Sequence, residues 1–156
     1  LKNLDSMGHG GDETIDLLGG VVQGERGARG RPQPEVVVQR LGAVVKRYVL
    51  NQYGTTTSHL HGGLPTDRCV AEWRLDSPRV NGLLAGSPEQ RGEILERISV
   101  PADIAEIRAS DPARAREIQA RAAQGFVKAF EHGLTVTGFE RSAETGTYTF
   151  GIWDSK

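Results

Sequence analysis

The sequence predicts a mixed α/β fold of the α+β kind, in which strands flank one short and one long helix. Apolar and polar residues alternate over 69–75, as in a strand with one buried face. Apolar residues recur at spacing four from Ile118 to Phe130, which places one stripe along a helix. Two β-rich runs near the end of the chain enclose a short turn and predict a hairpin.

The first 36 residues differ in amino-acid composition from the rest of the chain. They are rich in glycine and arginine, and their apolar clusters follow neither a helical nor a strand period for long. Such a segment buries too little surface to offset its conformational entropy. We therefore expect residues 1–36 to be disordered and residues 37–156 to form the folded domain.

Three strands and two loops are expected in the first half of this domain. Residues 43–50 are rich in β-branched and aromatic side chains and predict a strand. Glycines and prolines predict loops over 54–66 and 76–92, and 98–100 is a short strand before Pro101. In the strand over 69–75, the inward face is expected to carry Cys69, Ala71, Trp73 and Leu75, and the outward face Arg68, Glu72 and Arg74.

Two helices and a hairpin are expected in the second half. Residues 102–109 predict the short helix. The long helix begins at Asp111, whose carboxylate suits an N-cap, followed by Pro112 at the first helical position. Gly133 suits the left-handed residue that ends a helix. Strands over 134–139 and 147–153 then flank a turn at 142–146.

Composition restricts the class of partner. The formal net charge is −1, which argues against nucleic acid or an anionic membrane as the main partner. The motif Arg29-Gly30-Arg31-Pro32 matches the core of an AT-hook, but it occurs once in an otherwise neutral chain. Cys69 is the only cysteine, so we expect no internal disulfide, a core role for this side chain and a cytoplasmic location.

Several motifs resemble one known family. They are Leu41-Gly42-Ala43-Val44-Val45-Lys46-Arg47-Tyr48, Asn51-Gln52-Tyr53-Gly54, Gly63-Leu64-Pro65-Thr66-Asp67-Arg68, Ala71-Glu72-Trp73 and Val100-Pro101-Ala102-Asp103-Ile104. Over about residues 40–152 the chain resembles the C-terminal half of predicted GNAT-superfamily acetyltransferases. The resemblance implies a GNAT-type fold and transfer of an acyl group from acetyl-CoA to an amine.

The loop that would bind acetyl-CoA is not found in this chain. That loop resembles Arg/Gln-x-x-Gly-x-Gly/Ala and joins a strand to a helix, whose N-terminus holds the pyrophosphate. Residues 24–30 contain the right residue types, but Pro32 and Pro34 would block a helix behind them. The chain also begins with Leu1. We therefore expect a truncated or frameshifted fragment that is inactive alone.

Candidate site residues lie between positions 51 and 68. For acyl transfer to an amine, a histidine suits the base and a tyrosine the acid, so the catalytic candidates are Tyr53, His59 and His61. The substrate-binding candidates are Asn51, Asp67 and Arg68. Alternatively, Tyr53 and the histidines are solvated loop residues, His59 and His61 are half of a metal site, and Asp67 and Arg68 form a structural pair or turn cap.

A second function fits the same residues. A half-sheet leaves edge strands uncovered, so the chain is alternatively a non-catalytic protein-binding or dimerisation module. In that case a second copy or another chain would complete the sheet.

Overall fold

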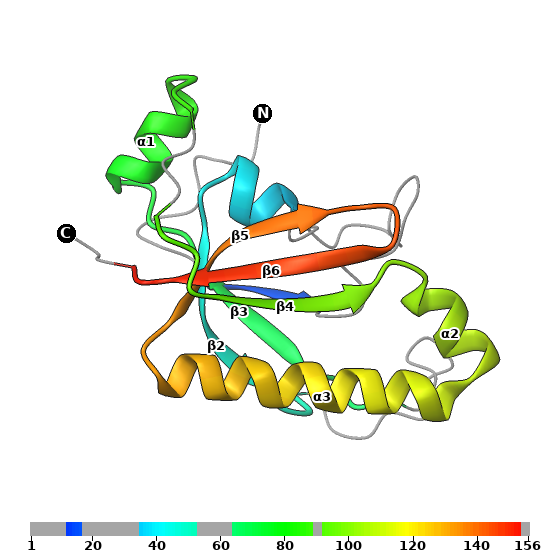
Figure 1. Cartoon of the computed structure of the whole chain (residues 1–156). Helices are drawn as coiled ribbons and strands as arrows, with labels where there is room; N and C mark the ends of the chain where they lie inside the picture. The colour runs from blue at the N-terminus through cyan, green and yellow to red at the C-terminus, as the bar shows by residue number, and fades with distance from the viewer. Residues whose placement is uncertain (1–11, 17–34, 53–63, 89–91, 154–156) are drawn as a thin grey trace.

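Six strands form one antiparallel sheet in the computed structural model, which describes residues 12–16, 35–52, 64–88 and 92–153 (Figure 1). The strand order across the sheet is β1-β3-β2-β5-β6-β4. The strands are β1 (Asp12–Asp16), β2 (Val44–Val49), β3 (Arg68–Glu72), β4 (Glu96–Pro101), β5 (Thr135–Arg141) and β6 (Thr145–Gly151). The helices are η3 (Glu35–Arg40), α1 (Pro78–Leu84), α2 (Ile104–Ser110) and α3 (Pro112–Glu131). This arrangement confirms the predicted mixed α+β class.

The helix α3 begins and ends where the sequence predicts. The Asp111 carboxylate accepts a hydrogen bond from the backbone N–H of Arg114 at 3.0 Å. At the other end, Gly133 has a φ of +76°, and its N–H donates to the carbonyl of Phe130. The next N–H, from Leu134, donates to the carbonyl of Ala129, which completes a Schellman ending.

The predicted stripe of α3 packs on the sheet and forms the centre of the core. In Figure 1 this helix runs along one side of the sheet, below β4 and β2. Phe126 is fully buried, and its ring lies 5.0 to 5.4 Å from the rings of Tyr48, Tyr148 and Phe150. These rings come from strands β2 and β6, so one side chain of α3 links two parts of the sheet.

On the opposite side of the sheet, η3 lies over β5, and α1 lies beyond the strands at the upper left of Figure 1. Arg79 of α1 connects these elements through one guanidinium. Its Nη2 donates to the carbonyl of Val38 at 3.1 Å and to that of Thr137 at 2.7 Å. The same group lies 5.5 Å from the ring centre of Trp153. A single arginine therefore links α1 to η3, to β5 and to the end of the described chain.

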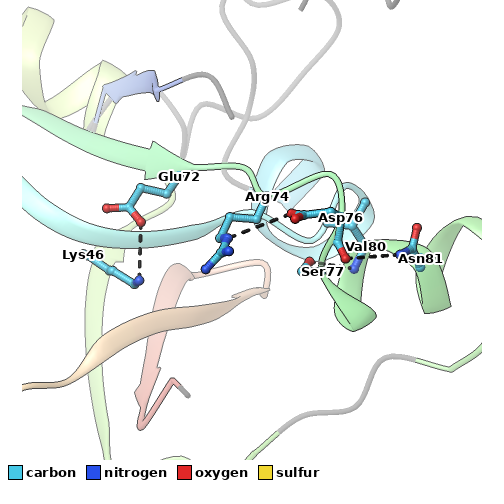
Figure 2. A network of polar contacts seen from close by, with 7 residues as sticks. All are labelled: Lys46, Glu72, Arg74, Asp76, Ser77, Val80 and Asn81. Carbon is cyan, nitrogen blue, oxygen red and sulfur yellow. Dashed lines mark hydrogen bonds and ion pairs between the residues drawn. The ribbon is translucent and has the colours of Figure 1, made fainter. Parts of the chain in front are cut away.

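Helix α1 lies where the sequence predicted a loop, and that prediction was wrong. Ser77 caps the helix by accepting a hydrogen bond from the N–H of Val80, and Pro78 stands at the first helical position (Figure 2). The helix has seven residues and buries only Val80. Its sequence shows little apolar periodicity, so its position depends on tertiary contacts such as those of Arg79.

Figure 2 also shows an ion pair between Lys46 of β2 and Glu72 of β3, at 3.3 Å.

Residues 1–36 were expected to be disordered, but two ordered elements involve them. Strand β1 lies within this segment, and η3 begins at its end. Strand β1 pairs with β3 over its whole length, from Asp12 opposite Glu72 to Asp16 opposite Arg68. Helix η3 places Val37 and Val38 in the core. Backbone pairing with a neighbouring strand does not require apolar alternation, which explains why the composition did not reveal β1. The remaining residues of 1–34 lie outside the described residues.

Strand β3 is covered on both faces, which the predicted alternation did not anticipate. Cys69 and Ala71 are buried as expected, and Cys69 is a small core residue. Arg68 and Val70, from the face predicted to be outward, are buried as well. Because β3 lies between β1 and β2, neither of its long edges is exposed. Among the described residues, no helix is both long enough and apolar enough to span a bilayer.

Candidate ligand-binding site

The chain turns sharply after β2, and a buried carboxylate organises the turn. Asn51 has a φ of 47°, a left-handed conformation that asparagine tolerates better than most residues. Its backbone N–H donates to Oδ1 of Asp67 at 2.8 Å. The hydroxyl of Tyr48 donates to Oδ2 of the same carboxylate, also at 2.8 Å. Asp67 therefore holds the end of β2 beside the start of β3.

Further hydrogen bonds join the two ends of this connection. The backbone N–H and the hydroxyl of Thr66 both reach Oδ1 of Asn51 at 3.4 Å. The N–H of Gln52 donates to the carbonyl of Thr66 at 3.0 Å. These hydrogen bonds hold residues 51–52 next to residues 66–67.

The phenol of Tyr48 is a fixed hydrogen-bond donor. Burial raises its pKa far above the ordinary value, and the neighbouring Asp67 carboxylate raises it further. A hydroxyl in this state keeps its proton at all physiological pH values. Tyr48 therefore positions the Asp67 carboxylate through a hydrogen bond that persists over this pH range.

A pocket of about 590 Å³ opens between this turn and α3. Its volume falls within the range usual for sites that bind small molecules. The turn contributes four residues and α3 contributes the rest, over more than four helical turns. The lining residues are Leu50, Asn51, Pro65, Asp67, Arg116, Gln119, Ala120, Ala123, Gln124, Val127, Lys128 and Glu131.

Gln119 contributes an unusual group to the wall of this pocket. The side chain is 4% exposed, and its Nε2 donates to the carbonyl of Pro65 at 2.8 Å. Because a carbonyl only accepts, this contact fixes which atom of the amide is nitrogen. The other atom, Oε1, is buried without a hydrogen-bond partner in the described part of the chain. A buried acceptor in this state costs roughly 1–3 kcal/mol.

The charged residues of the lining balance one another. Asp67 and Glu131 are acidic, whereas Arg116 and Lys128 are basic. Asp67 is 5% exposed, and the other three lie at the exposed rim on α3. The wall of the pocket is therefore mostly apolar, with the Asp67 carboxylate at the turn, while the rim carries charges of both signs.

The structure brings together two of the six residues predicted for the site. Asn51 and Asp67 are hydrogen-bonded and line the pocket. Arg68 does not line it: the side chain is 4% exposed within β3, and Nη1 donates to the carbonyl of Asp67 at 2.8 Å. That contact favours the structural interpretation of Arg68. The catalytic candidates Tyr53, His59 and His61, including the possible half metal site, lie outside the described residues.

Sequence reasoning missed the contribution of α3 to the pocket. Ala120, Ala123 and Val127 follow the helical period beside the predicted core stripe, so a second apolar stripe was present in the pattern. Gln119 lies between the two stripes, and its polar side chain predicts a surface position. No neighbouring residue indicates its burial, because its contact with Pro65 joins residues 54 positions apart.

Helices α1, α2 and α3 are preceded by Ser77, Asp103 and Asp111, and none of these three follows a glycine-rich turn. Residues 24–30, which contain the residue types of the expected acetyl-CoA loop, lie outside the described residues. Comparisons with protein families, with curated proteins and with solved structures find no match for this chain.

Proposed function

We propose that this chain is the acceptor-binding half of a GNAT-like N-acyltransferase, and that the pocket beside α3 holds the amine acceptor. The observation that supports the proposal is the Asp67 carboxylate, which lines the pocket. Each of its oxygens receives one hydrogen bond from the described residues, although a carboxylate oxygen can accept about two. A ligand that meets this carboxylate must bring N–H or O–H donors.

An amine meets this requirement better than a neutral ligand. An ammonium group has several N–H donors and a positive charge, so it can donate to the Asp67 carboxylate and compensate its charge at once. Hydrogen bonds to a charged group contribute about 1.5–3 kcal/mol, more than neutral ones. The apolar residues Leu50, Ala123 and Val127 would contact the carbon chain attached to the amine.

In this proposal the acyl donor binds to a segment other than this chain. The resemblance implies acetyl-CoA, and the loop that would bind it is not found in the sequence. We therefore expect the chain alone to bind an amine, to bind no acetyl-CoA and to transfer no acyl group. Saturable binding of acetyl-CoA in calorimetry would contradict this division of roles.

Calorimetric titration with hexylamine and hexyltrimethylammonium tests the amine assignment. Both probes carry a positive charge and an apolar chain, but only hexylamine has N–H donors. Hexylamine is expected to bind at least about tenfold more tightly, since one or two charged hydrogen bonds are lost in the other probe. Equal affinity, or no binding of hexylamine to the folded chain, would overturn the assignment.

Two acidic residues of the lining provide a matched pair of variants. Asp67→Asn removes the buried carboxylate, whereas Glu131→Gln removes an exposed one from the same pocket. We expect hexylamine affinity to fall about tenfold in the first variant and less than about twofold in the second. Equal losses would show that general electrostatic attraction, and not the buried carboxylate, determines binding.

The alternative function, a protein-binding or dimerisation module, rests on a different surface. Strand β4 is an edge of the sheet. Leu95 precedes it and is 47% exposed, and Ile152 follows the neighbouring β6 and is 73% exposed. Uncovered strand edges next to apolar side chains favour pairing with another chain. Sedimentation equilibrium of the chain and of a Leu95→Ser, Ile152→Ser variant tests this: a monomer at all concentrations excludes dimerisation.

A further inference from the structure

The pocket beside α3 follows an apolar stripe of the helix, made by Ala120, Ala123 and Val127, that the described part of the chain covers incompletely. Ala120 is exposed, and Val127 is only half-buried. Leu50, which borders the pocket from the turn after β2, is 61% exposed. Exposed apolar side chains that gather in one groove are typical of a surface that another protein covers.

Charged residues of opposite sign lie at the two ends of this stripe. Arg116 lies before it on α3 and Glu131 lies after it, and both side chains are exposed and line the pocket. Fifteen residues separate the two, which is about 22.5 Å along the helix axis. Arg116 also makes an interaction within its own chain, but a guanidinium has five N–H donors and can serve a second partner.

This side of α3 is complementary to itself when two copies of the helix run antiparallel. A twofold axis just after Ala123 places Arg116 of each copy opposite Glu131 of the other. The same axis places Ala120 of each copy opposite Val127 of the other. A parallel pair would instead place like charges opposite each other at both ends, which costs binding energy. The charge pattern therefore favours a second copy of this chain, in the antiparallel orientation.

We infer that a second copy of this chain docks on the stripe, with the two α3 helices antiparallel and an Arg116–Glu131 ion pair at each end. The small side chains of the stripe let the helices approach to the distance usual for packed helices, about 8–10 Å between axes. The inference does not depend on the proposed amine-binding function. A partner helix and an amine would occupy the same groove and therefore exclude each other.

Sedimentation equilibrium at about 0.01 M salt, where screening is weak, tests the inference with charge reversals. Arg116→Glu places two carboxylates opposite each other at both ends of the pair, so the dimer should weaken at least about tenfold. Glu131→Arg places two cations there, with the same expected loss. Arg121→Glu is the matched control: it changes the net charge as Arg116→Glu does, but Arg121 is exposed outside the pocket lining. It should weaken the dimer less than about threefold.

Recombining the reversed charges tests the pairing itself. In the double variant Arg116→Glu, Glu131→Arg, opposite charges face each other again, so the dimer affinity should return to within about threefold of the wild type. An equimolar mixture of the two single variants should form a heterodimer, because each copy then carries at both ends the charge opposite to that of the other. Failure of both the double variant and the mixture to regain affinity would contradict the antiparallel pair.

Other results would also overturn the inference. One is a wild-type chain that stays monomeric up to about 1 mM. Another is a dimer that the reversals at positions 116 and 131 leave unchanged; if Leu95→Ser, Ile152→Ser abolishes that dimer, the β4 edge is the interface instead. A third is equal weakening by Arg121→Glu and Arg116→Glu, which would show that net charge and not the groove governs association.

Discussion

Two neighbouring sides of α3 differ in how tightly other parts of the chain pack against them. On the side that faces the sheet, the fully buried Phe126 contacts aromatic rings from β2 and β6. On the adjacent side, Ala120, Ala123 and Val127 border the pocket beside the turn after β2. Large rings fill the space between helix and sheet, whereas alanines leave room for a ligand. The same helix therefore contributes a stable core through one stripe and a candidate site through the next.

The polar groups follow the same division. The aromatic side of α3 holds no buried polar side chain between Ala122 and Ala129, whereas the pocket side holds the buried amide of Gln119 with its unpaired Oε1. An unpaired acceptor lowers stability, and proteins commonly accept such costs at functional sites. Incomplete packing and incomplete hydrogen bonding therefore occur together beside the best-packed stripe, which is where a functional site is expected.

The largest expected effect comes from truncating the aromatic side. Phe126→Ala should lower the free energy of unfolding by about 3–5 kcal/mol, because it removes a buried ring and leaves a cavity. Val127→Ala, one residue away on the half-buried pocket side, should cost about 1 kcal/mol. Urea denaturation measures both values. Similar losses for the two variants would mean that the two sides are equally packed.

An intermediate effect is expected for the hydroxyl that joins the core to the pocket. Tyr48→Phe removes a donor from the buried Asp67 carboxylate and should cost about 1.5–3 kcal/mol near neutral pH. The aromatic contact with Phe126, at 5.4 Å, is retained in this variant. Chemical denaturation at pH 7 gives the difference, and a loss below about 0.5 kcal/mol would show that this hydrogen bond contributes little.

The pH dependence of that effect has a definite sign. The pKa of Tyr48 is raised in the folded state, so above its ordinary value of 10.0 the unfolded chain loses a proton that the folded chain keeps. This stability is fully present below pH 10 and decreases as the pH rises further. The wild type should lose up to about 1.4 kcal/mol per pH unit more than Tyr48→Phe in that range. Parallel stability profiles of the two proteins above pH 10 would contradict this.

The smallest effect on stability is expected on the pocket side. Gln119→Met removes the unpaired Oε1 but also the hydrogen bond to Pro65, so the two contributions largely cancel. The free energy of unfolding should change by less than about 1 kcal/mol in urea denaturation. A large destabilisation would mean that this glutamine is mainly a structural residue.

Local signals in the sequence determined a good part of this protein. Four features follow from neighbouring residues, since caps and periodicity act over one or two turns. They are the caps at Asp111 and Gly133, the apolar stripe of α3, the strand 44–49 and the C-terminal hairpin. The sequence also predicted Asn51 and Asp67 as substrate-binding residues; the structure joins them by a hydrogen bond at the turn, and their role stays a prediction.

Only the tertiary structure decided the rest. Strand β1 exists through its pairing with β3, and α1 is held by contacts that Arg79 makes with carbonyls 41 and 58 residues away. The pocket depends on Gln119 meeting Pro65, a contact across 54 residues. A composition or a period records how a residue relates to its neighbours in the chain. Which distant backbone groups it meets depends on how the whole sheet is assembled, because those partners are brought together only by folding.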